Sequence, residues 1–420
     1  MLGIDPDDTL SPGMLRKVVY GGSHSVSFRH AEKDIFELAE SRVSAARIRR
    51  ATERIGQERV AQRQAEVSFW NALGLPQKQQ APPGKTPPVV ACVQMDGGRM
   101  QIFDRQESDA PAEKDASQQG LWRENKVGCL LGMTSPVHEQ DPCPQIPQTF
   151  VDPQRIAKLA REIKNAHSPA RKRQEPAEKA SVVDELVQER PRHWKAPEIV
   201  SKTVVATRQN IDVFGPLLAA TAWMLGFAAA ARKAFVADGS DTNWSVWRKY
   251  FSHYTPILDF VHAICYVYQA ALAGRTLEEA WPIYCQWAQW VWAGEVAAVI
   301  AALRTRQEEI GLPQEADPAT SPQKVVATAL GYLENQQSRM KYAEYRQQGL
   351  PISSVHVEST IKQINRRVKG TEKFWSTGGG ESLLQLSADG LSDTLPLTVF
   401  WQQRYRNRSG QRSYALATAA

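Results

Sequence analysis

Three carboxylates lie at the ends of segments whose residue patterns predict a strand or a helix. Asp96 ends an apolar run just before a Gly-Gly pair, and Asp238 ends a second apolar run. Glu358 lies near the start of a segment, 354–362, whose apolar periodicity predicts a helix. Hard divalent cations prefer oxygen ligands, and a pair of such ions serves two-metal phosphoryl transfer. We therefore expect Asp96, Asp238 and Glu358 to converge on one metal site.

Each acid also has a plainer explanation. Asp96 before two glycines is typical of an ordinary turn, and Asp238 opens an Asp-Gly turn. Glu358 precedes Lys362 by four residues, which on a helix gives a surface ion pair. The order and context of the three acids, rather than any one of them, favour the metal site.

A further acid competes with Asp238. Asp259 ends the next predicted strand, 254–259, and His262 follows it in an Asp-x-x-His element. We assign the second ligand to Asp238, because its strand follows a long predicted crossover helix, 215–232. Open α/β sheets place their ligands at the carboxyl ends of such strands. Asp259 and His262 are expected to support the site, and Asp259 stays open as the alternative second ligand.

Two sets of basic residues suit a polyanionic partner. The predicted helix of Glu358 carries cations on a polar stripe beside its apolar stripe. Two more helices are predicted at 31–41 and 45–60, separated by a short turn and bearing a basic face. Such a pair is either a helix-turn-helix that reads DNA or a solvated helical hairpin, and both interpretations stay open. The residues concerned are Lys362, Arg366 and Lys369 in the first set, and Arg47, Arg50 and Arg54 in the second.

Further short segments surround these acids in a characteristic order. A stretch from Trp122 to Lys126 (Trp-Arg-Glu-Asn-Lys) opens a predicted strand, and Glu358 is followed by Ile-Lys, a basic run ending in Gly370, and Phe-Trp. Together with Asp96, Asp238 and the Asp-x-x-His element, this order resembles the DDE transposases of bacterial insertion sequences. The resemblance covers roughly residues 89–133 and 215–375.

The resemblance implies an α/β fold, with an RNase H-like mixed sheet, an N-terminal helical domain and an all-helical insertion. It implies a DNA transposase that cleaves and transfers strands with two Mg²⁺ or Mn²⁺ ions held by Asp96, Asp238 and Glu358. The partners implied are element ends and target DNA, bound by a homodimer or higher oligomer. A Trp of the insertion would stack on an unpaired base, a role that falls to Trp287, although core packing is its preferred interpretation.

Two other functions stay open: a non-catalytic DNA-binding remnant of a transposase, and a structure-specific nuclease on the same fold. No Gly-rich phosphate loop followed by Lys-Ser/Thr occurs, and no His-Glu-x-x-His zinc motif.

Composition is compatible with these functions. The 420 residues, of which 42% are hydrophobic, suffice for two or three units. A net charge of +6 and a pI near 9.0 permit a polyanionic partner. Five widely spaced cysteines lack any Cys-x-x-Cys pair, and the opening of the chain does not have the pattern of a signal peptide. We expect a cytoplasmic protein without a membrane span.

The chain divides by composition. Strands are expected at 89–96, 99–103 and 122–133, the first two joined by a hairpin turn at the Gly-Gly pair. Short helices are expected at 153–165 and 181–189. The predicted units are a helical region at 1–76, a linker at 77–88, the first part of the sheet core at 89–270 with a mobile excursion at 134–200, a helical insertion at 271–350, the helix of Glu358 at 351–376, and an irregular tail at 377–420.

Overall fold

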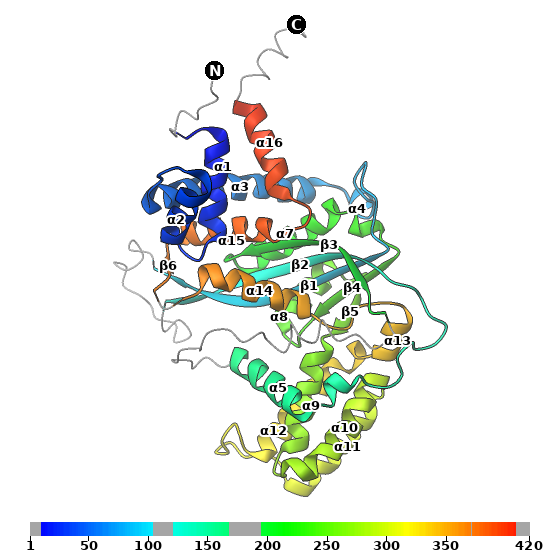
Figure 1. The fold of residues 1–420 in the computed structure, drawn as a ribbon. Coiled ribbons are helices and arrows are strands. Elements are labelled where there is room, and N and C mark those ends of the chain that lie inside the picture. Colours follow the sequence, from blue (N-terminus) through cyan, green and yellow to red (C-terminus); the bar gives the residue numbers. More distant parts are fainter. Residues whose placement is uncertain (1–9, 104–120, 168–194, 371, 409–420) are drawn as a thin grey trace.

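A six-stranded mixed sheet forms the centre of the protein (Figure 1). The computed structural model describes residues 10–103, 121–167, 195–370 and 372–408. The strand order is β3-β2-β1-β4-β5, and the short β6 pairs with the far end of β1. The strands are β1 (Val90–Ile102), β2 (Trp122–Thr134), β3 (Glu198–Thr207), β4 (Arg232–Ala237), β5 (Thr255–Leu258) and β6 (Phe374–Trp375).

The sheet has an antiparallel half and a parallel half. β1 pairs antiparallel with β2, and β2 antiparallel with β3. On its other side β1 runs parallel to β4, and β4 parallel to β5. Apolar residues fill both faces of β1 and β2, which are buried along most of their length, as helix-covered strands require.

The hairpin turn expected at Gly97 and Gly98 is wrong, because both glycines lie inside β1. They pair with Lys126 and Asn125 of β2, so the segments 89–96 and 99–103 form one strand. A Cβ on Gly98 would lie 2.4 Å from the Asn125 Oδ1 atom, and one on Gly97 would lie 2.9 Å from Glu124 Oε1. The glycines therefore make room for side chains of β2 rather than for a turn.

The third antiparallel strand is β3, which the sequence interpretation did not find. Its first residues fall at the end of the range 134–200, which was expected to be a mobile excursion with two short helices. The helix expected at 153–165 is confirmed as α5 (Pro153–His167). The helix expected at 181–189 lies outside the described residues.

Helices cover the two faces of the sheet. On one face, α7 (Ile211–Met224) packs on β2, where a Cβ on Gly128 would meet Leu218 and Phe214. On the other face, α14 (Val355–Val368) lies against β1 and β2. Figure 1 shows α15 (Thr377–Gly390) beside α7, with α3 (Ala45–Ala72) forming a further layer outside both.

The expected irregular tail at 377–420 is wrong for its described part. It forms α15 and α16 (Pro396–Arg408), and α15 is buried along almost its whole length. Buried ion pairs join α15 to α3: Arg63 to Glu381 at 2.8 Å and Arg59 to Asp389 at 3.0 Å. The long-range partners of α15 explain its order, and they could not be read from the local sequence.

The N-terminal helices form a small bundle against α15 and α16. The expected helices are confirmed as α2 (Phe28–Ala39) and α3, and α1 (Pro12–His24) precedes them. Ser44 caps α3, since its hydroxyl accepts a hydrogen bond from the Arg47 amide. The short α4 (Leu75–Lys78) follows, so the linker expected at 77–88 begins inside a helix. The rest of that range, 79–88, contains no helix or strand, as expected.

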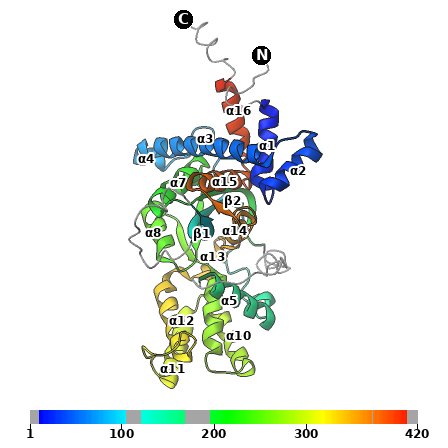
Figure 2. The ribbon, with the colours of Figure 1, turned by 90° about the vertical axis from the view of Figure 1, so that its left-hand side faces the viewer.

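The range 271–350 is helical, as expected for the insertion. Figures 1 and 2 show its main helices at the end of the molecule opposite α1 and α16. Among the described helices, none combines the length and the apolar character that a membrane crossing requires. The remaining helices are α8 (Asp241–Tyr250), α9 (Phe260–Leu272), α10 (Leu277–Ala293), α11 (Val296–Ile310), α12 (Pro322–Gln336) and α13 (Tyr342–Gln347).

Candidate active site

Three aspartates lie in one row across the parallel half of the sheet. Gln94 of β1 pairs with Val236 of β4, and Val236 pairs with Ile257 of β5. Two residues further along, the three strands reach Asp96, Asp238 and Asp259. The Asp259 amide donates to the Ala237 carbonyl at 2.8 Å, so the parallel ladder continues to this level. Residues in register on parallel strands point to the same face, and the row therefore gathers its carboxylates.

Glu358 reaches the same face from α14. Gln94, two residues before Asp96, points toward the start of this helix: its amide nitrogen donates to the Ser353 carbonyl at 2.9 Å, and its oxygen accepts from the Val357 amide at 3.2 Å. Glu358 follows in the first turn of α14. Gln94, which lies next to Asp96 on the same face of β1, thus holds the helix that carries Glu358.

Asp259 is fully buried and its carboxylate is saturated with hydrogen bonds. One oxygen accepts from the His262 amide at 2.9 Å and caps α9. The other accepts short hydrogen bonds from the amide and hydroxyl of Ser354, the residue that precedes α14. Asp259 therefore ties the end of β5 to the start of the helix of Glu358.

His262 lies between two acids. Its Nδ1 is 3.4 Å from Asp259 Oδ1 and 3.9 Å from Glu358 Oε1. Burial by itself lowers the pKa of His262, but the hydrogen bond to Asp259 and the charges of Asp259 and Glu358 raise it to about 10. Although burial by itself opposes ionisation of Asp259, its bonds to His262 and Ser354 hold its pKa at about 2. The pair is therefore charged at neutral pH.

The pKa of Glu358 is shifted in the opposite direction to that of Asp259. Burial, together with the negative charges of Asp259 and Asp96, raises its pKa to about 7, against the lowering effect of His262 and Lys362. The charge of Asp238 also acts on His262. The charges of Asp238, Asp259 and Glu358 thus act on one imidazole, and that of Asp96 acts on Glu358. A divalent cation would neutralise this excess of negative charge.

Two sets of metal ligands are conceivable in this cluster. Ligand atoms of Asp259, His262 and Glu358 all lie within 4.8 Å of one another. The oxygens of Asp259 are, however, occupied by protein donors, and its side chain is inaccessible to solvent. Asp96 and Asp238 lie outside that tight group, but both are partly exposed, as Glu358 is. A cation approaching from solvent therefore meets Asp96, Asp238 and Glu358 first.

Asp238 is oriented by its own loop. One carboxylate oxygen accepts hydrogen bonds from the Ser240 amide at 3.0 Å and from Asn243 Nδ2 at 2.7 Å. Asn243 lies in the first turn of α8, so the strand end and the following helix hold this carboxylate together. The sequence interpretation missed Gln94, Ser354 and Asn243 as positioning residues. Each holds a site acid or the helix of Glu358 through a hydrogen bond, and no sequence motif marks these bonds.

The expected nucleic-acid contacts divide into three groups. Arg366 is exposed on α14, and Lys369 is exposed directly after its last residue. The Nζ atom of Lys362 lies 3.9 Å from Oε2 of Glu162 on α5. On α3, Arg50 is exposed, and Arg47 and Arg54 are partly exposed. Trp287 does not present its ring at the surface: it is 5% exposed and packs in the core of the helical insertion. Base stacking on Trp287 is therefore not supported, and core packing is confirmed.

No protein-family model matches the chain, and no curated protein matches it in sequence.

Proposed function

We propose that this chain is a DNA transposase of the DDE type, built on an RNase H-like core. The single observation that carries the proposal is the placement of the acids. Asp96 and Asp238 lie at one level of two adjacent parallel strands, and Glu358 approaches them from the helix packed on that face.

The sheet topology supports the same proposal. The chain leaves β1 toward β2 on one side, while β4 lies on the other side of β1. In open α/β sheets, ligands bind in the crevice at such a switch point, outside the carboxyl ends of the strands. Three antiparallel strands followed by two parallel ones are the order expected of an RNase H-like core, and Asp96 and Asp238 flank this switch point.

The residues present fit two Mg²⁺ or Mn²⁺ ions, because the accessible donors are carboxylate oxygens and the cluster has excess negative charge. Asp96, Asp238 and Glu358 would hold the ions, which supply activation of a nucleophilic oxygen and stabilisation of the leaving oxygen. Asp259 and His262 keep the helix of Glu358 at the strand ends. Lys362, Arg366 and Lys369 extend from the site along α14, where they would meet DNA phosphates.

The proposed partner is DNA, both the element ends and the target, bound by a homodimer or a higher oligomer. The N-terminal helices would provide a second DNA contact through Arg47, Arg50 and Arg54. The proposal places the protein in the cytoplasm, where this DNA is accessible.

The test is a cleavage and joining assay on the DNA that flanks the chain's own coding sequence. Asp96→Asn, Asp238→Asn and Glu358→Gln should each abolish Mg²⁺- and Mn²⁺-dependent cleavage while DNA binding persists. Glu344→Gln, which removes an exposed acid of α13, serves as the matched control and should retain activity. Cleavage without joining would instead identify a nuclease on this fold, and binding without metal-dependent chemistry would identify a non-catalytic remnant.

A further inference from the structure

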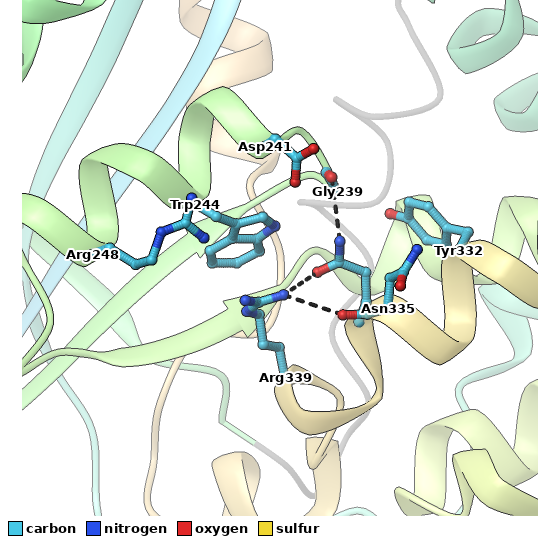
Figure 3. A pocket seen from close by; sticks show the side chains of 8 residues that line it. Gly239, Asp241, Trp244, Arg248, Tyr332, Asn335 and Arg339 are labelled. Carbon is cyan, nitrogen blue, oxygen red and sulfur yellow. Dashed lines mark hydrogen bonds between the residues drawn. The ribbon is translucent and has the colours of Figure 1, made fainter.

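A polar hollow of about 390 Å³ opens at Gly239, the residue that follows Asp238 (Figure 3). It lies between the start of α8 and the end of α12, and Gly239 forms part of its wall. A Cβ on Gly239 would lie 2.2 Å from the ring of Tyr332, so only glycine allows the loop after Asp238 to approach α12 this closely. The lining residues are Gly239, Asp241, Trp244, Arg248, Tyr332, Asn335, Gln336 and Arg339.

Two buried donors in the wall of this hollow have no protein partner among the described residues. These are the indole Nε1 of Trp244, a side chain only 1% exposed, and the hydroxyl of Tyr332. Figure 3 shows the two polar atoms turned toward the space between their rings. A buried donor without an acceptor costs about 1–3 kcal/mol, so this pair indicates an acceptor that enters from outside.

Two guanidinium groups also reach the hollow. The Arg339 guanidinium lies 4.4 Å from the centre of the Trp244 ring, and its Nη1 donates to Gln336 Oε1 at 2.7 Å. Gln336 in turn donates to the Gly239 carbonyl at 3.3 Å, which fixes Arg339 relative to the strand end. Arg248 of α8 lines the hollow as well, with Asp241 as the only acid among its lining residues.

These donors share a preference for one kind of ligand. A phosphate group carries negative charge and several acceptor oxygens, and it takes guanidinium, indole and phenol donors together. We propose that the hollow binds the phosphate of a DNA nucleotide next to the bond that is cut. The inference rests on the proposed function. If Asp238 holds a metal ion at the phosphate that is cut, a phosphate bound next to Gly239 belongs to a neighbouring nucleotide.

The test uses binding rather than chemistry. A labelled duplex of the element end is titrated with the full chain in EDTA, and each phosphate near the cleavage position is replaced in turn by a neutral methylphosphonate. We expect one position at which replacement weakens wild-type binding about tenfold, the value of one charge-assisted hydrogen bond. In Tyr332→Phe and in Arg339→Gln, replacement at that position should weaken binding less than it does in wild type, because one donor to the phosphate is already lost.

The variants are chosen so that folding does not obscure the result. Tyr332→Phe removes a hydroxyl that has no partner among the residues the structure describes, so its melting curve should match that of wild type. Tyr405→Phe and Arg16→Gln are matched controls, since both side chains are exposed on helices at the opposite end of the molecule, α16 and α1. They should leave the methylphosphonate profile unchanged.

A second arm distinguishes the source of the phosphate. Inorganic phosphate is titrated against the tryptophan fluorescence of wild type and Tyr332→Phe. Quenching that requires Tyr332, without any DNA position coupled to it, would overturn DNA as the source and leave free phosphate as the ligand. If the chain binds DNA, but no methylphosphonate position is coupled to Tyr332 or Arg339 and inorganic phosphate does not bind, the proposed phosphate site is wrong and the proposed function stands. A wild-type chain that binds no DNA would overturn the proposed function, while the phosphate titration would still decide on the hollow.

Discussion

Asp238 and Asp259 provide the sharpest test of the site, because their carboxylates lie in one row but have different surroundings. The perturbation is Asp238→Asn against Asp259→Asn, two changes of equal size. In Asp238 the hydrogen bonds from Ser240 and Asn243 both go to one oxygen, which the amide oxygen of asparagine can replace. We expect this variant to lose less than about 1 kcal/mol of folding free energy.

Asp259→Asn should behave differently. Both oxygens of Asp259 accept hydrogen bonds, from His262 on one side and Ser354 on the other. An amide group has one acceptor oxygen, so its NH₂ must face donors, and the imidazolium of His262 loses its buried counterion. Breaking a buried ion pair costs about 3–5 kcal/mol, and we expect a loss of this size.

The assay combines chemical denaturation in EDTA with strand cleavage in Mg²⁺ and in Mn²⁺. Asp238→Asn should be stable and inactive. Asp259→Asn should be unstable but retain cleavage reduced about 10- to 100-fold, as for residues that orient metal ligands. Asp212→Asn, an exposed acid of α7, is the control for loss of charge. A stable, inactive Asp259→Asn together with an active Asp238→Asn would refute the reasoning and place Asp259 among the metal ligands.

Three further predictions concern the ion pair of His262, the packing of Gly56 on α15, and the cations on and just after α14. The folded pKa of His262, about 10, exceeds its unfolded value of 6.5, so its stabilisation is complete below pH 6.5 and is lost as pH rises toward 10. Denaturation curves of His262→Gln in EDTA should therefore vary less with pH between 7 and 10 than those of wild type, and parallel curves would contradict the ion pair. Gly56→Ala should cost about 1–3 kcal/mol, since its Cβ would lie 2.8 Å from the Ser382 Cα of α15, whereas Gly331→Ala, with open space around it, should be neutral or stabilising in the same measurement. Arg366→Gln and Lys369→Gln should each reduce the slope of log affinity for DNA against log salt by about 0.9, and Lys362→Gln by less because Glu162 lies beside it; unchanged slopes would assign these cations to a solvated surface.

Much of the site was predictable because its parts are local. The apolar run before Asp238 indicated the end of β4, and the periodicity after Ser354 indicated the helix of Glu358. Asp96 was also expected at a strand end, but it lies inside β1. The supporting role expected for Asp259 and His262 agrees with their burial and their mutual ion pair. These inferences depended only on residue type and on spacing within a segment, which the sequence displays directly.

Other features depended on partners distant in the chain. Gly97 and Gly98 were expected in a turn, but side chains of β2 demand glycine inside a strand. The segment that forms α15 was expected to be irregular. Its order comes from packing on α3 and β3, which are distant in the sequence, so the local pattern did not show it.

The sequence by itself determined which acids follow an apolar run and which one opens a helix, because these patterns are local to each segment. Only the tertiary structure decided their register, which places Asp96, Asp238 and Asp259 in one row, and their accessibility, which separates Asp259 from the others. It also buried Trp287 and brought Trp244, Tyr332 and Arg339 together beside Asp238. The physical reason is that burial and register depend on pairings between distant segments, whereas the pattern within a segment specifies only its own element.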